Sequence, residues 1–392
     1  MARAVSADQV LFDECIEEFY YNQNGSESPK SPQDKCGYLL LDFSLKETIF
    51  TEHFSIEPSY EIILPGAYKA FISRVNLPMW AENSLDSHLF TLGLASVFSF
   101  ATGRPVKAPR DGYISSRELS DDALSELAIK FPVLSAGPGA HHTSISRETL
   151  TKMSTNINEI VNLLYSLPYD KYKKFMQSIR LVHLGLNNKR EDFGLGYYLL
   201  VSAIEPIATQ AIKRKTVAID NPELKKWREL AKKDPDIQKI IDAYQQELSK
   251  NRYISKRFVE FVLRYCPPEE WHYLEHPQEN LAQVVKEMSP STSIDWITSK
   301  RWFEIYPSDL GIDEIKTILS DVYTHRSKYT HEGSNPPHKT IYNTDRFFTT
   351  EYIDNESVGR DSSKLITLPK FELISFIAQR SISNYLKEVS QG

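Results

Sequence analysis

The spacing of apolar residues along the chain changes near residue 146. Before that point, residues 37–64 contain short runs rich in β-branched and aromatic residues, separated by polar turns, and this pattern predicts a few antiparallel strands. The segment 84–103 opens with serine and aspartate, is apolar on most faces and ends at Gly103, which predicts a buried helix. Beyond residue 146 apolar residues recur every three or four positions, which indicates helices.

The second half of the chain is predicted to be all helical. Its expected helices cover 147–166, 169–186, 192–215, 235–249, 253–265, 279–288, 312–332 and 369–388. Between the last two lies a polar segment, 333–364, of more than thirty residues. A loop of that length inside a compact domain is usually functional or partly disordered.

These patterns predict an α+β protein with two domains. Glycine and proline occur repeatedly in two segments, 103–115 and 135–146, which are therefore expected to be loops. The second of these loops places a domain boundary near residue 145. We expect a mixed α/β N-terminal domain, 1–145, with a short antiparallel sheet and a sensing or regulatory role, followed by an all-α domain over 146–392. The 392 residues suffice for two cores, because single cores stop growing at about 250–300 residues.

Composition favours a cytoplasmic protein. Cys15, Cys36 and Cys266 are too few and too scattered for a disulfide framework or a zinc site, which agrees with a reducing compartment. No stretch approaches the roughly 20 apolar residues of a membrane span, and acidic residues occur too early for a signal peptide. We therefore expect no membrane contact.

Charge is unevenly distributed along the chain. The formal net charge is -6, and residues 1–60 hold eleven acidic and four basic residues. Residues 213–257 instead hold thirteen basic and seven acidic residues, beginning with Lys213, Arg214 and Lys215. This segment is a candidate RNA-binding surface, and the other interpretation is a solvated charged helix face.

The helix expected at 312–332 places an arginine among its apolar residues. The apolar stripe consists of Ile312, Ile315, Leu319 and Val322. Continuing the same spacing leads to Arg326 and then Tyr329. A buried guanidinium loses its hydration and does not readily release its proton, so it needs a partner. An internal carboxylate, a subunit interface or an anionic ligand such as a phosphodiester would each provide one.

A histidine follows five positions after this arginine. Gly333 supplies a helix stop, which puts His331 in the last turn. On an ideal helix the two side chains point about 140° apart. They can meet if the last turn distorts, or if two copies of the helix end meet at a two-fold axis.

An arginine and an imidazole suit RNA cleavage without a metal. Imidazole titrates near pH 6.5, so it can deprotonate the ribose 2′-OH or protonate the leaving 5′-oxygen, while a guanidinium stabilises charge on the phosphate oxygens. The alternative is structural: a surface arginine, and a histidine that stabilises the C-terminal end of the helix.

Two segments resemble the HEPN superfamily, in particular its ApeA-like branch. The segment "LSDVYTHRSKYTHEG" (319–333) is similar to the R-S-x-x-x-H-x-G form of its motif, and "GYYLLVSAIEPIATQ" (196–210) resembles the first core helix with its Ala-x-Glu signature. The resemblance covers roughly residues 190–390 and has no counterpart in the N-terminal half.

The resemblance implies a helical bundle that forms a homodimer and brings two motifs together. It also implies a metal-independent endoribonuclease, used in toxin–antitoxin pairs or phage defence. Arg326 would then bind phosphate and His331 would act as general acid or base. Ser327 departs from the Asn, Asp or His that several active branches carry there. The alternative is a non-catalytic HEPN module that binds RNA or protein.

Further residues are supporting candidates. Glu205 follows an apolar stripe and would neutralise Arg326 or orient a catalytic group, unless it is a solvated edge residue. Ser327 would offer a helper hydroxyl. Lys328 and His325 are candidates for RNA contact, Lys328 also for the partner helix.

No cofactor or metal is expected. His141 and His142 are adjacent, with no cysteine or carboxylate cluster beside them, and no phosphate-binding loop or nucleophile-elbow motif occurs. The expected partners are RNA, a second copy of the chain, and an antitoxin or a phage-derived trigger.

Overall fold

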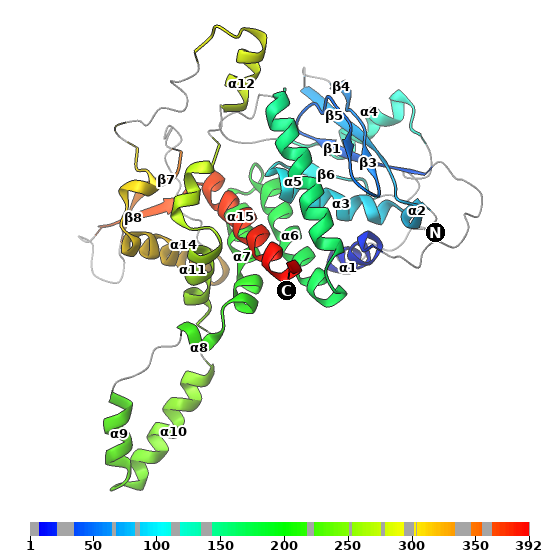
Figure 1. The fold of residues 1–392 in the computed structure, drawn as a ribbon. Coiled ribbons are helices and arrows are strands. Elements are labelled where there is room, and N and C mark those ends of the chain that lie inside the picture. The colour runs from blue at the N-terminus through cyan, green and yellow to red at the C-terminus, as the bar shows by residue number, and fades with distance from the viewer. Residues whose placement is uncertain are drawn as a thin grey trace.

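The computed structural model shows a mostly helical chain with two small antiparallel sheets (Figure 1). It describes residues 8–21, 35–64, 68–82, 87–110, 118–134, 143–217, 223–250, 253–275, 279–293, 302, 304–333, 346–354 and 363–391. The first part contains α1 (Asp8–Phe19), β1 (Cys36–Leu41), β2 (Ile49–Phe50), β3 (Ser55–Ile56), β4 (Tyr60–Leu64), β5 (Tyr68–Asn76), α2 (Met79–Glu82), α3 (Ser87–Thr102), β6 (Val106–Lys107) and α4 (Asp121–Lys130).

The remaining elements are mainly helices. They are α5 (Arg147–Tyr165), α6 (Tyr169–Asn188), α7 (Phe193–Ala211), α8 (Arg214–Val217), α9 (Glu223–Ala231), α10 (Pro235–Lys250), α11 (Ile254–Tyr265), η2 (Pro268–Tyr273), α12 (Glu279–Met288), η3 (Pro307–Asp309), α14 (Ile312–Glu332), β7 (Phe348–Asp354), β8 (Ser363–Pro369) and α15 (Phe371–Gln391). Most of the expected helices are confirmed, with ends that differ by a few residues. The helix expected at 192–215 is instead two helices, α7 and α8, and α9 is not among the predicted helices.

The N-terminal sheet has the order β2-β3-β5-β1-β6, with β4 also paired to β5. Successive residues of β1 pack on opposite faces: Leu39 and Leu41 join the main core, and Tyr38 and Leu40 join a small cluster with α4. Helix α3 lies so close to β1 that a Cβ at Gly37 would fall 2.0 Å from Thr91 Oγ1. Burial on both faces explains why this strand is apolar throughout.

The strands predicted within 37–64 are confirmed, but β5 (Tyr68–Asn76) lies entirely after that range and is not among the predicted strands. This strand is the hub of the sheet, because β1, β3 and β4 all pair with it. The predicted helix at 84–103 corresponds to α3.

Helices α6 and α7 form the centre of the second half. They approach closely at two glycines: a Cβ on Gly196 would lie 2.9 Å from the carbonyl oxygen of Gly185. This contact fixes the first turns of α7, the helix that carries Glu205. Helix α3 packs on α5 and α6, so one hydrophobic core crosses residue 145, where the sequence predicts a boundary.

The prediction of an all-α second half is wrong. Strands β7 and β8 pair from Phe348 opposite Pro369 to Asp354 opposite Ser363, and β7 lies inside the segment predicted as a loop, 333–364. Buried Phe348 and Leu368 attach this hairpin to the core. The strands are separated by a polar stretch, and their pairing provides the hydrogen bonds that neither makes alone.

Helices α9 and α10 form a hairpin that projects from the body (Figure 1). Trp227 and Tyr244 join its two helices edge to face, with ring centroids 5.5 Å apart. No residue of α9 is fully buried, and Lys226 and Lys232 form ion pairs with acidic residues one turn away. Within the described residues, every helix is too short or too polar to cross a lipid bilayer.

Candidate functional site

Arg326 projects from α14 toward α7. Its side chain is 19% exposed, and the side chain of Glu205, its partner on α7, is 20% exposed. The apolar spacing of α14 therefore places Arg326 on the inner face, as the sequence predicts. Of the three kinds of partner expected for a buried guanidinium, the structure shows the internal carboxylate. Arg326 Nη2 lies 2.8 Å from Glu205 Oε2, an ion pair in which the donor is not aligned for a hydrogen bond.

Polar and aromatic groups complete the surroundings of this guanidinium. Arg326 Nε donates a hydrogen bond of 3.3 Å to Ser202 Oγ. The guanidinium carbon lies 5.3 Å from the ring centre of Tyr198 and 5.8 Å from that of Tyr323, distances typical of cation–π contacts. Burial, and next the charge of Glu205, raise the pKa of Tyr323, so this phenol stays neutral. The guanidinium is held in one orientation.

An open pocket between α7, α11 and α14 gives access to this group. It is lined by Leu181, Tyr198, Leu199, Ser202, Glu205, Pro206, Thr209, Ile254, Arg257 and Arg326. Arg257, from the first turn of α11, is a second guanidinium that sequence reasoning missed. Its position in a basic segment is a signal, but the sequence does not show that α11 packs against α7 and α14.

His331 lies in the last turn of α14 and is exposed. The structure describes no hydrogen bond or ion pair for its ring. The helix continues to Glu332 and ends at Gly333, which adopts a left-handed conformation with φ of 66°. Because α14 does not break between Arg326 and His331, the two side chains lie on different faces, about 140° apart. A single chain therefore does not join them through a distorted last turn.

The other predicted residues have varied surroundings. His325 is only 6% exposed, so in this conformation its ring is closed to a nucleic acid. Ser327 and Lys328 are partly exposed on α14, and Lys213 is exposed. Arg214 lies over the ring of Tyr253, the residue before α11, whereas the side chain of Lys215 is outside the part of the chain described.

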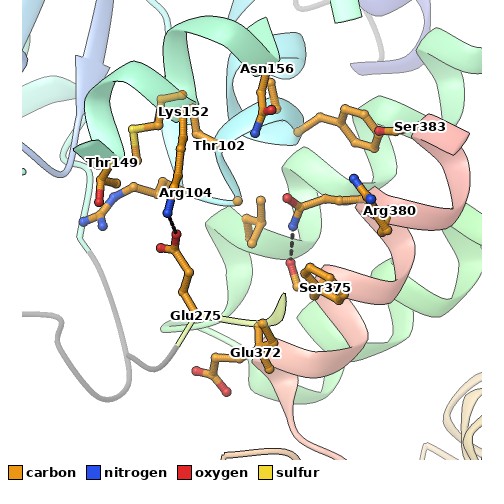
Figure 2. Close-up of a pocket in the computed structure, with 18 of the residues that line it drawn as sticks. Thr102, Arg104, Thr149, Lys152, Asn156, Glu275, Glu372, Ser375, Arg380 and Ser383 are labelled. Carbon is orange, nitrogen blue, oxygen red and sulfur yellow. Dashed lines mark hydrogen bonds and ion pairs between the residues drawn. The ribbon is translucent and has the colours of Figure 1, made fainter. Parts of the chain in front are cut away.

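A second pocket, of about 470 Å³, lies where the end of α3 meets α5, η2 and α15 (Figure 2). Its basic residues all form ion pairs; these are Arg104 with Asp42, Lys152 with Glu275, Lys189 with Glu372, Arg380 with Glu270, and Lys387 with Glu159. Its charges therefore satisfy one another. The Arg326 pocket differs, because it has two guanidiniums and one carboxylate.

Among the described residues, no group of three or more His, Cys, Asp and Glu side chains is arranged to hold a metal ion. Comparisons with known protein families, with characterised proteins and with solved structures found no match for this chain. The residues of the Arg326 pocket and His331 are therefore the basis on which a function is proposed.

Proposed function

We propose that this chain is a metal-independent endoribonuclease of the HEPN type that acts as a homodimer. The observation that supports this most is that the oriented guanidinium of Arg326 lines an open pocket. Arg326 lies on α14, the same helix that ends with the exposed His331. This guanidinium is oriented by a carboxylate, has aromatic rings beside it and is open on one side, and such a group can bind a phosphodiester.

The nucleophile is the 2′-hydroxyl of the RNA, which attacks the adjacent phosphorus. An imidazole of His331 takes the proton of the 2′-OH, the 2′-oxygen forms a bond to phosphorus, and the bond from phosphorus to the 5′-oxygen breaks. The 5′-oxygen takes up a proton from water, which leaves a 2′,3′-cyclic phosphate and a 5′-hydroxyl. Arg326 stabilises the negative charge that gathers on the phosphate oxygens.

A second copy of the chain completes the site. Since Arg326 and His331 of one helix point about 140° apart, the arginine of one copy and the histidine of the other would act on one phosphate. The exposed last turn of α14 leaves room for such a contact. Toxin–antitoxin pairing or phage defence, with an antitoxin or phage-derived trigger, are the settings proposed for this activity.

The proposal is tested by incubating the purified full chain with single-stranded RNA and with DNA of the same sequence. We expect cleavage of RNA alone, unchanged by EDTA, with products that end in 2′,3′-cyclic phosphate and 5′-hydroxyl. Cleavage that requires a divalent ion, or 5′-phosphate products, would exclude this mechanism.

The pairing of Arg326 with Glu205 also favours a second candidate, a non-catalytic module that binds RNA or protein. In that case the ion pair would only support the fold. This candidate would be favoured if the protein binds RNA but leaves it intact. The RNA should then stay uncleaved both with the purified protein and in cells to which its expression is toxic.

A further inference from the structure

We propose that Arg257 and Arg326 together form a binding site for a phosphate group of RNA. The new element is Arg257, which has no part in the function proposed above. The inference rests on the proposed function in naming RNA as the source of the phosphate. The observation that carries it is the convergence of two guanidiniums from α11 and α14 on one pocket that holds a single carboxylate.

Arg257 has no acceptor for its buried donor. The structure describes no ion pair for it, and its Nε atom is buried without a hydrogen-bond partner. By contrast, Arg264, two turns later on α11, is exposed and lies 3.8 Å from a carboxylate oxygen of Glu388. A buried N–H without an acceptor is costly, so an acceptor that enters the pocket would remove this cost.

The charge balance of the pocket favours a singly charged anion. Glu205 compensates Arg326, and no carboxylate among the lining residues remains for Arg257, so the pocket keeps one excess positive charge. A phosphodiester carries one negative charge and two free oxygens, and the planar fork of a guanidinium matches that geometry.

The start of α11 adds to the positive potential. Arg257 lies in the first turn of this twelve-residue helix, whose N-cap residue Tyr253 has a φ of 50° and makes no side-chain capping hydrogen bond. Arg214 and Lys256 both approach the ring of Tyr253, at 5.7 and 5.6 Å. The helix dipole and these cations add positive potential at the N-terminal end of α11, where Arg257 lies, and this potential attracts a polyanion. Of the basic segment found in the sequence, Ile254 and Arg257 line the pocket.

The test measures binding of a 2′-O-methyl RNA oligonucleotide, which lacks the nucleophile and cannot be cleaved. Fluorescence anisotropy is recorded with the full chain over a range of salt concentrations. We expect Arg257→Gln to weaken binding about tenfold, and to reduce the slope of log affinity against log salt by about one, since one phosphate contact is lost. Arg264→Gln is the matched control and should change neither value.

Two further variants separate phosphate contact from structural support. Glu205→Gln keeps the size of the side chain but removes the only lining carboxylate, so we expect tighter binding by several-fold. Arg257→Lys keeps the charge but not the fork, and should bind between the wild type and Arg257→Gln. Thermal unfolding of each variant shows whether the fold is retained. If Arg257→Gln does not fold, binding by Arg257→Lys is compared with the wild type instead.

The results distinguish this inference from the proposed nuclease activity. If the wild type cleaves RNA but Arg257→Gln binds and cleaves like the Arg264→Gln control, the phosphate site is wrong and the nuclease stands. If the oligonucleotide binds with the expected dependence on Arg257 but RNA is never cleaved, the phosphate site stands and the nuclease is wrong. An unchanged salt slope in Arg257→Gln would overturn the inference.

Discussion

Replacing His331 by alanine is expected to lower the rate of RNA cleavage by about 10²- to 10⁴-fold, the usual contribution of a general acid or base. The midpoint of thermal unfolding should stay the same. His331 is exposed in the last turn of α14, and no contact among the described residues depends on its ring. A catalytic role is therefore separable from a structural one at this position.

The rate is measured with excess RNA at fixed protein concentration, beside an unfolding curve for each variant. His272→Ala is the control, because this histidine is also exposed but lies on η2, away from α14. Full cleavage by His331→Ala would show that the imidazole takes no part in the reaction.

Replacing Glu205 by alanine is expected to lower the free energy of unfolding by about 1–3 kcal/mol. The change leaves the mostly buried Arg326 guanidinium without its carboxylate, in a pocket that also contains Arg257. The partial exposure of the pair keeps the expected value below that of a fully buried ion pair. Chemical unfolding of the full chain gives the measurement.

A double-mutant cycle with Arg326→Ala shows whether the two residues stabilise the fold as a pair. The double variant should be less destabilised than the sum of the single variants, by about 1–2 kcal/mol. The exposed pair of Asp313 and Lys316, on the same helix, is the control, for which we expect about 0.5 kcal/mol or less. Additive single effects at Glu205 and Arg326 would mean that their contact contributes nothing.

The position of Arg326 was predictable because helical periodicity is a local property. The buried apolar residues Ile315, Ile318, Leu319 and Val322 define the inner face of α14, and Arg326 lies one turn further along the same face. Ile312, the first residue of the predicted stripe, is instead 53% exposed. The pairing of Arg326 with Glu205 was one of several open possibilities. Local spacing cannot select among them, because the partner lies more than a hundred residues earlier in the chain.

Other features depend on packing between distant segments. Arg257 joins the pocket only because α11 packs against both α7 and α14. Strand β5 mixes polar and apolar residues, and its role as the hub of the sheet follows from pairing with three other strands. The β7–β8 hairpin likewise depends on the register of two strands separated by residues 355–362. The resemblance to the HEPN superfamily remains a prediction based on the motif residues.

The central claim is that Arg326 of one chain and His331 of another act on the same phosphate. Its most direct test mixes two inactive variants, Arg326→Gln and His331→Ala, under conditions in which mixed dimers form, as shown by native mass spectrometry. Half of the dimers would be mixed, and each would hold one complete pair, so the mixture should recover up to about a quarter of the wild-type rate of RNA cleavage. A mixture as inactive as either variant alone, while the wild type cleaves RNA, would contradict the claim.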